Sequence, residues 1–289
     1  MSGRCRNAAG PLAAVAALTV VFGTAVSRPA ALAQAPSIAS QPAPPQGGRG
    51  GRGGAPAGPA RTTAPVDLTG TWVSVVTEDW QWRMRTPPKG DYTSVPLTPQ
   101  GRKVADSWDE SKDGMCEAYG AGGIMRMPGR LRIGWRDDNT LTIETDAGQQ
   151  TRLLQFTPPG GPPITSATAN QARTRQGTSM ATWQRSGGAF DAFLERGAGA
   201  GQQQRWGSLK VVTTGVLSGW LRRNGVPYSE NAVITEYFTR FNHPDAGEWF
   251  VVTTLVEDPM YLSAPFTTSS NFRKEPDGAK WNPAPCRTS

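Results

Sequence analysis

Two runs of alternating residues carry the side chains best suited to bind an organic molecule, and the first covers residues 80–85. Trp80, Trp82 and Met84 alternate there with two arginines. In a β-strand, successive side chains point to opposite faces, so we expect the flat apolar groups on one face and the cations on the other. Turned inward, the aromatic face would either hold a ring-bearing ligand or serve as ordinary core.

The second run combines hydroxyl groups with aromatic rings across two neighbouring segments. One face carries Val233, Thr235, Tyr237, Thr239 and Phe241 in the first segment, and Trp249, Val251, Thr253 and Leu255 in the next. A filled core needs no threonine, so this face is expected either to line a cavity, with Tyr237 and Trp249 as ligand contacts, or to be core. Glu236 and Arg240 lie on the opposite face, where we expect water to solvate them.

A glycine-dense segment, residues 116–129, is the third candidate. If it forms a loop at the mouth of a rigid scaffold, Tyr119 and Arg126 would be placed to contact a ligand, although many such loops are only connections. The segment also holds methionines, which are soft metal ligands. However, the chain has a single histidine, His243, in an expected hairpin turn. We therefore predict neither a metal site nor a cofactor.

The motifs of the common enzyme classes are missing from the sequence. It contains no G-x-S-x-G, H-E-x-x-H or C-x-x-C spacing. Catalysis would then depend on a carboxyl or phenol group inside a dry barrel, for instance Glu236 or Tyr237, and no catalytic residue is assigned. A barrel enzyme of the hydrolase, isomerase or cyclase type stays an alternative to ligand binding, as does a structural or adhesion module without a ligand.

Short runs rich in Val, Thr, Trp, Tyr and Phe, separated by turn residues, predict the β-strands that must position these groups. The runs are residues 71–77, 80–85, 130–135, 140–145, 150–156, 178–184, 209–214, 232–241, 248–256 and 266–273. Short turns between neighbours predict antiparallel pairing. Because closure removes exposed edges, the pattern favours an all-β meander that forms a closed or nearly closed barrel. A two-sheet β-sandwich is the alternative.

The hairpin over residues 130–146 sets its own register. Pairing Ile133 with Ile143 aligns two apolar faces, and it also puts Arg132 opposite Glu144. A shift by one residue would mix the charged and the apolar sets. We expect the charged face to be solvated, and an inward arginine pair that grips an anionic ligand is the alternative.

One helix signal stands out, over residues 98–112. Thr98 is a suitable N-cap, Pro99 fits the first helical position, and Val104 and Trp108 share a face. We expect one short helix, which either closes a mouth of the barrel or packs on its outside.

The N-terminal residues 1–33 have the pattern of a cleaved secretory signal peptide. Arg4 and Arg6 precede an apolar run over residues 11–26, and Ala31-Leu32-Ala33 fits the signal-peptidase rule. The run is short for a membrane span. We expect cleavage and export to the periplasm or beyond, with no stable membrane insertion afterwards, and a retained anchor is the alternative.

Residues 34–65 contain no aromatic residue and are rich in Pro and Gly, which predicts a disordered linker to a single domain, residues 66–289. The basic charge belongs to the leading segments. Of the 30 Lys and Arg residues, six precede the domain, which therefore holds 24 against 23 acidic residues. A nearly neutral domain gives no reason to expect a nucleic-acid partner.

Two cysteines remain after loss of the signal, Cys116 and Cys286. In an exported chain an even pair predicts a disulfide. Two free thiols, or a thiolate metal site, are the alternatives.

The segment from Asp67 to Trp72, DLTGTW, resembles the G-x-W start of the lipocalins and their relatives, the avidins and fatty-acid-binding proteins. The resemblance implies an up-and-down barrel around a cavity for a small, often apolar ligand. It also implies that Trp72 plugs one end of the barrel beneath an arginine of the last strand, for which Arg273 is the candidate. Those families are shorter, and residues 157–176 and 186–204 look like insertions.

Taken whole, the chain resembles exported bacterial lipocalin-like (calycin-type) barrel proteins. We therefore expect a soluble, disulfide-closed barrel that binds a small apolar or aromatic molecule. The expected ligand contacts are Trp80, Trp82, Tyr119, Arg126, Tyr237 and Trp249.

Overall fold

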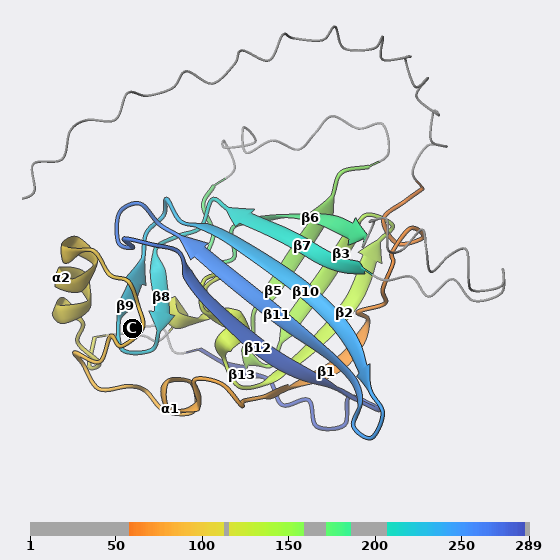
Figure 1. The fold of residues 1–289 in the computed structure, drawn as a ribbon, viewed down its shortest axis with the longest axis horizontal. Coiled ribbons are helices and arrows are strands. Elements are labelled where there is room, and N and C mark those ends of the chain that lie inside the picture. The colour runs from red at the N-terminus through yellow and green to blue at the C-terminus, as the bar shows by residue number, and fades with distance from the viewer. Residues whose placement is uncertain (1–57, 113–115, 159–171, 186–206, 287–289) are drawn as a thin grey trace, which may run out of the picture. The chain divides into compact units, whose positions relative to one another are not determined.

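The computed structural model describes residues 58–112, 116–158, 172–185 and 207–286. Within them nine strands form a closed barrel in the order β1-β12-β11-β10-β7-β6-β5-β3-β2 (Figure 1). The barrel strands are β1 (Gly70–Val75), β2 (Arg130–Asp137), β3 (Thr140–Thr145), β5 (Thr151–Phe156), β6 (Thr178–Arg185), β7 (Gly207–Thr214), β10 (Val233–His243), β11 (Gly247–Glu257) and β12 (Phe266–Glu275). The predicted closed barrel is confirmed and the sandwich alternative is wrong. The expected signal peptide and most of the expected linker lie outside the described ranges.

The barrel is mixed rather than purely antiparallel, so the predicted simple meander is wrong at one place. Strands β5 and β6 pair in parallel, with Leu154 opposite Ser179, while the other neighbouring barrel strands are antiparallel. An antiparallel pair needs only a tight turn, whereas a parallel pair needs a long crossover. The expected insertion that begins at residue 157 lies between these two strands and supplies that length.

Short elements complete the described chain. They are α1 (Trp80–Arg83), α2 (Pro99–Ser107), the 3₁₀ turns Cys116–Tyr119 and Ile124–Arg126, β4 (Ala147–Gly148) paired with β13 (Ala284–Pro285), and β8 (Gly219–Arg222) paired with β9 (Val226–Tyr228). Figure 1 shows α1, α2 and the β8–β9 hairpin toward one end of the barrel and the orange segment before β1 toward the other. Among the described residues, no helix has the length and hydropathy needed to cross a bilayer.

Residues 80–85 do not form the predicted strand. Asp79 adopts a left-handed conformation (φ 52°) and begins the single turn of α1, in which the Met84 N–H donates to the Trp80 carbonyl oxygen at 2.8 Å. Residues four apart share one face of a helix. Trp80 and Met84 are therefore both exposed (60% and 56%), while Arg83 is buried. The run has the period of a strand but the hydrogen bonding of a helical turn.

The helix predicted from Thr98 is confirmed, although it is shorter than expected. The Thr98 hydroxyl accepts a hydrogen bond from the Gly101 N–H at 3.0 Å, and Pro99 is the first helical residue of α2. The helix ends at Ser107, where Trp108 turns to an extended conformation (ψ 137°). Helix α2 packs against β9, outside the nine barrel strands (Figure 1).

The predicted register of the β2–β3 hairpin is confirmed. Ile133 lies opposite Ile143, and Arg132 lies opposite Glu144. Both isoleucines are buried, whereas Arg132 and Glu144 are exposed, so burial of the apolar set decides the register. The Arg132 guanidinium lies 4.2 Å from the ring centre of Trp281, outside the barrel, so the inward alternative is wrong for this arginine.

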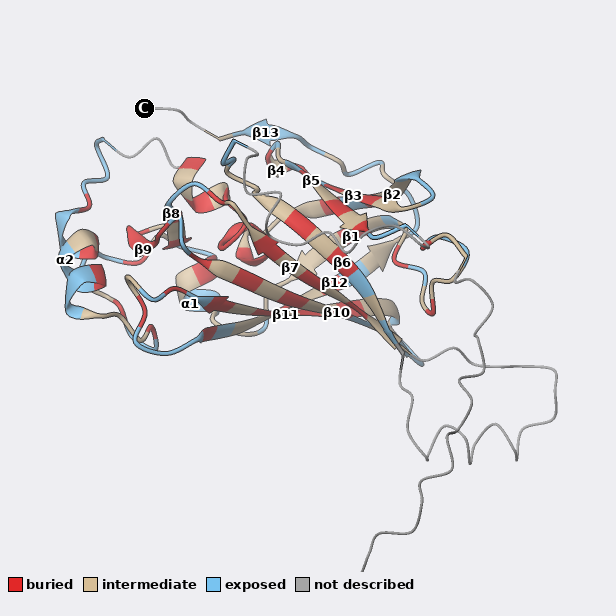
Figure 2. Cartoon of the chain, turned by 90° about the horizontal axis from the view of Figure 1, so that it is seen from above, coloured by how far each residue is buried: buried red, intermediate tan, exposed pale blue. Residues whose placement is uncertain are grey.

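The inward face of β10 and β11 is the opposite of the predicted one. Figure 2 shows buried residues alternating along these strands, and Glu236, Phe238 and Phe250 are among them. Tyr237 and Trp249 therefore lie half-buried on the outward face. The inward face buries the phenylalanines, and it accepts Glu236 because an arginine inside the barrel balances the carboxylate, as described below.

Buried side chains fill the barrel in two apolar clusters. The first gathers Trp72, Phe250 and Phe272 with the inward residues of β2 and β3. The second gathers Tyr228 and Phe266 with residues near α2, β8 and β9.

Trp72 lies inside the barrel, as the resemblance implies, but the cation at its ring is Lys274. The indole N–H donates to the Leu68 carbonyl oxygen at 2.9 Å, and the ring meets Phe250 edge-on at 4.7 Å. The Lys274 ammonium lies 5.5 Å from the indole centre. Arg273 is exposed, because side chains alternate along β12, and Lys274 takes the place that the resemblance gives to Arg273.

Residues 58–65, which the composition assigns to the linker, lie against the barrel. Ala60 is buried, its N–H donates to Asn139 Oδ1 at 3.0 Å, and its carbonyl oxygen accepts from the Trp183 indole N–H at 2.9 Å. The folded domain therefore begins before Val66.

Candidate functional site

A groove of about 390 Å³ opens at the end of the barrel where the chain enters β1. One wall is the N-terminal segment 61–69, and the other wall is made by the ends of three strands. The strand residues that line it are Trp135 on β2, Leu141 on β3 and Trp183 on β6.

Hydrogen bonds of backbone and side-chain groups hold the N-terminal wall in place. The Arg61 N–H donates to the Asp138 carbonyl oxygen at 3.0 Å, which ties the segment to the β2–β3 turn. Further along, Asp67 Oδ1 accepts from the Thr69 N–H at 2.9 Å and from the Thr69 hydroxyl at 2.8 Å. The Trp183 indole N–H is used by Ala60, so its ring orientation is fixed before any ligand arrives.

Aromatic rings form the apolar part of the groove. Trp135 and Trp183 lie 6.4 Å apart between ring centres, and Phe156 packs behind both, at 5.8 Å and 5.2 Å. Both indoles are only half-buried, so apolar ring surface faces the groove. Arg61 and Asp67 put one charge of each sign on the opposite wall. The arrangement combines two ring surfaces with an opposite wall that is largely polar, so it can take a flat ring that also carries polar groups.

None of the six expected ligand contacts lines this groove. Trp80 is exposed on α1, and Tyr237 and Trp249 lie on the outward face of β10 and β11. Only Trp82 and Arg126 come together, since both lie beside the buried arginine of β8.

Trp135 and Trp183 were not expected as ligand contacts. Trp135 ends one predicted strand, and Trp183 lies one residue before the end of another, beside turns or insertions. An aromatic residue at the end of a barrel strand lies at a mouth of the barrel, and this was the feature of the sequence that could have identified Trp135 and Trp183 as ligand contacts.

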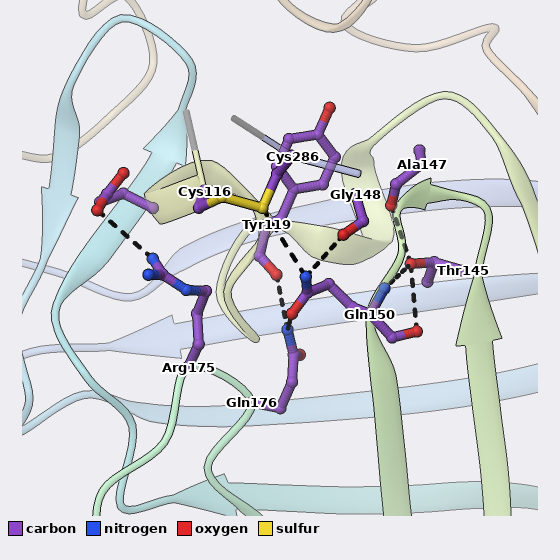
Figure 3. Close-up of a disulfide and its surroundings, with 10 residues drawn as sticks. Cys116, Tyr119, Thr145, Ala147, Gly148, Gln150, Arg175, Gln176 and Cys286 are labelled. Carbon is purple, nitrogen blue, oxygen red and sulfur yellow. Dashed lines mark hydrogen bonds and ion pairs between the residues drawn. A yellow bond between two sulfur atoms is a disulfide. The ribbon is translucent and has the colours of Figure 1, made fainter. Parts of the chain in front are cut away.

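Tyr119, the remaining expected contact, lies beside the disulfide that Cys116 and Cys286 form (Figure 3). The Tyr119 carbonyl oxygen accepts from Gln176 Nε2 at 2.7 Å, and the same amide donates to Gln150 Oε1 at 3.1 Å. The predicted disulfide is confirmed. It joins the C-terminal tail to this network, and β13 pairs beside it with β4. The segment that carries Tyr119 is therefore held by the disulfide and by its hydrogen bond to Gln176.

A buried ion pair crosses the barrel interior, where the sequence places Glu236 in solvent. Arg152 on β5 donates from Nη1 and Nη2 to the two Glu236 oxygens, at 3.0 Å and 2.6 Å, and both side chains are fully buried. Arg152 Nη2 also reaches the Thr213 hydroxyl at 3.3 Å, which bonds to Ser179 at 2.7 Å. Both oxygens of Glu236 are thus occupied by a cation, an arrangement that suits a structural charge pair better than a proton-transfer group.

Within the described part of the chain, no three His, Cys, Asp or Glu side chains are placed to hold a metal ion. Comparison of the chain with models of protein families, with curated proteins and with solved structures finds no match.

Proposed function

We propose that this chain is an exported, lipocalin-like β-barrel protein that binds a small apolar or aromatic molecule in the groove beside Trp135 and Trp183. The observation that carries the proposal is the groove itself, about 390 Å³ with two indole rings along one wall. Small-molecule sites usually enclose roughly 300–1,000 Å³ and combine apolar walls with a few polar groups.

The binding energy would come mainly from burial of ring surface. Each 100 Å² of apolar area removed from water contributes about 2.5 kcal/mol, and ring contacts with tryptophan add about 0.5–1.5 kcal/mol. Loss of ligand freedom offsets part of this gain. Because Trp183 is already fixed by Ala60, little additional side-chain ordering is needed on that wall.

Two features support export. The first 33 residues have the signal-peptide pattern, and Cys116 and Cys286 form a disulfide, as is usual in oxidising compartments. The lipocalin-like assignment is supported by the closed barrel and by Trp72, which ends the G-x-W motif and lies buried beneath a cation of the last barrel strand. The parallel β5–β6 pair is a departure from an up-and-down barrel.

The test uses N-phenyl-1-naphthylamine, an uncharged aromatic probe whose fluorescence rises in apolar sites. We expect saturable binding to the mature protein and a loss of affinity of at least about tenfold in Trp183→Ala or Trp135→Ala, equivalent to about 1.4 kcal/mol. Trp249→Ala is the matched control, because it removes an indole from the outward face of β11. Thermal unfolding of each variant separates lost binding from lost folding. Equal affinities in the Trp183 and Trp249 variants, or no saturable binding, would overturn the proposal.

A further inference from the structure

Three arginine side chains are buried next to one another beneath α1. Arg83 comes from α1, Arg126 from the 3₁₀ turn Ile124–Arg126, and Arg222 from the end of β8, and they are 2%, 6% and 3% exposed. Arg83 Nε donates to the Arg126 carbonyl oxygen at 2.9 Å, which links the first two. Burying cations together is costly unless anions balance them.

Carboxylates balance two of the three cations. Arg83 pairs with Glu78, and Arg126 Nη1 lies 3.0 Å from Asp79 Oδ2. Within the described residues, Arg222 has no carboxylate at ion-pair distance, although Asp79 and Asp91 attract it from farther away. These five side chains therefore leave one positive charge unpaired by contact.

The aromatic surroundings of Arg222 do not satisfy its N–H groups. Its guanidinium lies 4.4 Å from the ring centre of Trp82 and 5.9 Å from that of Phe266, and Arg126 lies over the same Phe266 ring at 5.7 Å. Trp82 is itself held by Asp91, which accepts from its indole N–H at 2.8 Å. The rings thus fix the positions of two guanidinium groups that share Phe266.

Several donors of these two arginines point at no acceptor. Arg222 Nε, Arg222 Nη1 and Arg126 Nη2 are shielded from solvent and have no hydrogen-bond partner among the described residues. A buried donor without an acceptor costs about 1–3 kcal/mol, and more when it is charged. Burial, followed by the repulsion of Arg126, lowers the pKa of Arg222 to about 10. Unused donors and fixed geometry coincide at one place, where the carboxylates nearest to Arg222 do not contact it.

We propose that Arg126 and Arg222 form a binding site for the carboxylate of a small organic acid. A carboxylate would supply the direct anionic contact that Arg222 lacks, and its oxygens are good acceptors for the free guanidinium N–H groups. This site is separate from the groove of Trp135 and Trp183, and it takes a different chemical class.

Access to this carboxylate site lies on the side of α1. Asp79, the partner of Arg126, is 32% exposed, so the cluster reaches the surface there. Helix α1 is a single turn, and its first flanking residue, Asp79, has the left-handed conformation that non-glycine residues rarely adopt.

The test uses sodium acetate, with sodium chloride at the same ionic strength as the reference. We expect 100 mM acetate to raise the Tm of the mature protein by about 3–6 °C in a saturable manner, if the Kd is near 10 mM. Saturation-transfer NMR on the acetate methyl group measures the same binding directly. Both signals should vanish in Arg222→Met, whose Tm without acetate should be no lower than that of the natural protein, because an unpaired buried charge is removed.

Arg132→Met is the matched control, since Arg132 also lies over a tryptophan ring, at 4.2 Å, but is exposed. We expect it to keep the acetate response, as should Trp183→Ala, which tests the groove alone. If Arg222→Met is too unstable to assay, Arg126→Gln with the NMR readout replaces it. An acetate response that survives in the Arg222 or Arg126 variant overturns the site. Equal stabilisation by sulfate or phosphate through Arg222 overturns the choice of a carboxylate.

Discussion

Arg152 Nη2 lies 2.6 Å from Glu236 Oε2 inside the barrel, although 84 residues separate the two in the chain. Along the inward face of β10, Glu236 follows Ile234 of one apolar cluster and precedes Phe238 of the other. The pair, together with Thr213 and Ser179, therefore forms a polar layer between two apolar parts of the barrel interior.

Removing one partner of this pair should destabilise the protein strongly. Glu236→Ala leaves Arg152 as an uncompensated buried cation, and we expect a loss of about 3–5 kcal/mol in the free energy of unfolding. Replacing both partners, as in Arg152→Met with Glu236→Leu, should cost far less and can be neutral, because no charge is then buried. Urea unfolding measures the free energy of unfolding of the single and the double variant.

The exposed pair Lys112–Asp109 is the control for this prediction. It joins side chains that are 82% and 43% exposed, so Asp109→Ala should leave the free energy of unfolding nearly unchanged. If Glu236→Ala changes the free energy of unfolding as little as Asp109→Ala does, the Arg152–Glu236 pair does not stabilise the protein as predicted.

Local patterns in the sequence predict the parts of the fold that are specified locally. The β2–β3 register follows from two short segments that must bury their isoleucines, and the α2 cap follows from Thr98 and Pro99 alone. The disulfide follows from the presence of only two cysteines in the domain, Cys116 and Cys286.

Features set by distant contacts were not predictable in the same way. Both faces of β10 carry aromatic residues, and its inward face can be recognised only once Arg152 is known to meet Glu236. The alternation over residues 80–85 suits a strand equally well, and the ion pair of Arg83 with Glu78 is a tertiary contact that the pattern does not encode. The groove was missed because four separate segments meet to form it.

Lys274, rather than Arg273, should stabilise the buried indole of Trp72. The Lys274 ammonium lies 5.5 Å from the ring centre and 2.7 Å from a Glu248 oxygen, so Lys274→Met should cost about 1 kcal/mol or somewhat more. Arg273 is exposed, and Arg273→Met should change the free energy of unfolding by no more than about 0.5 kcal/mol. Urea unfolding of the two variants compares adjacent positions of β12. A larger effect at Arg273 would contradict the assignment.

Tyr228 should make the protein less stable as the pH rises above 10. Its phenol group is fully buried without a hydrogen-bond partner among the described residues, and it lies so close to Gly120 that a Cβ there would be 2.1 Å from the phenol oxygen. Burial raises the pKa of Tyr228 to about 12, against 10.0 for the free group. Between these values the unfolded chain has lost the proton that the folded chain keeps, so the free energy of unfolding falls with pH, by up to about 2–3 kcal/mol.

Tyr228→Phe should remove this contribution, and at pH 8 it should change the stability by less than about 1 kcal/mol, because no hydrogen bond is lost. Urea unfolding at pH 8, 10 and 11 measures the difference between the two proteins. Tyr237→Phe, a change on the outward face of β10, serves as the control and should leave the Tyr228 contribution in place. If the Tyr228→Phe variant loses stability between pH 10 and 11 as steeply as the natural protein does, another group causes the loss of stability at alkaline pH.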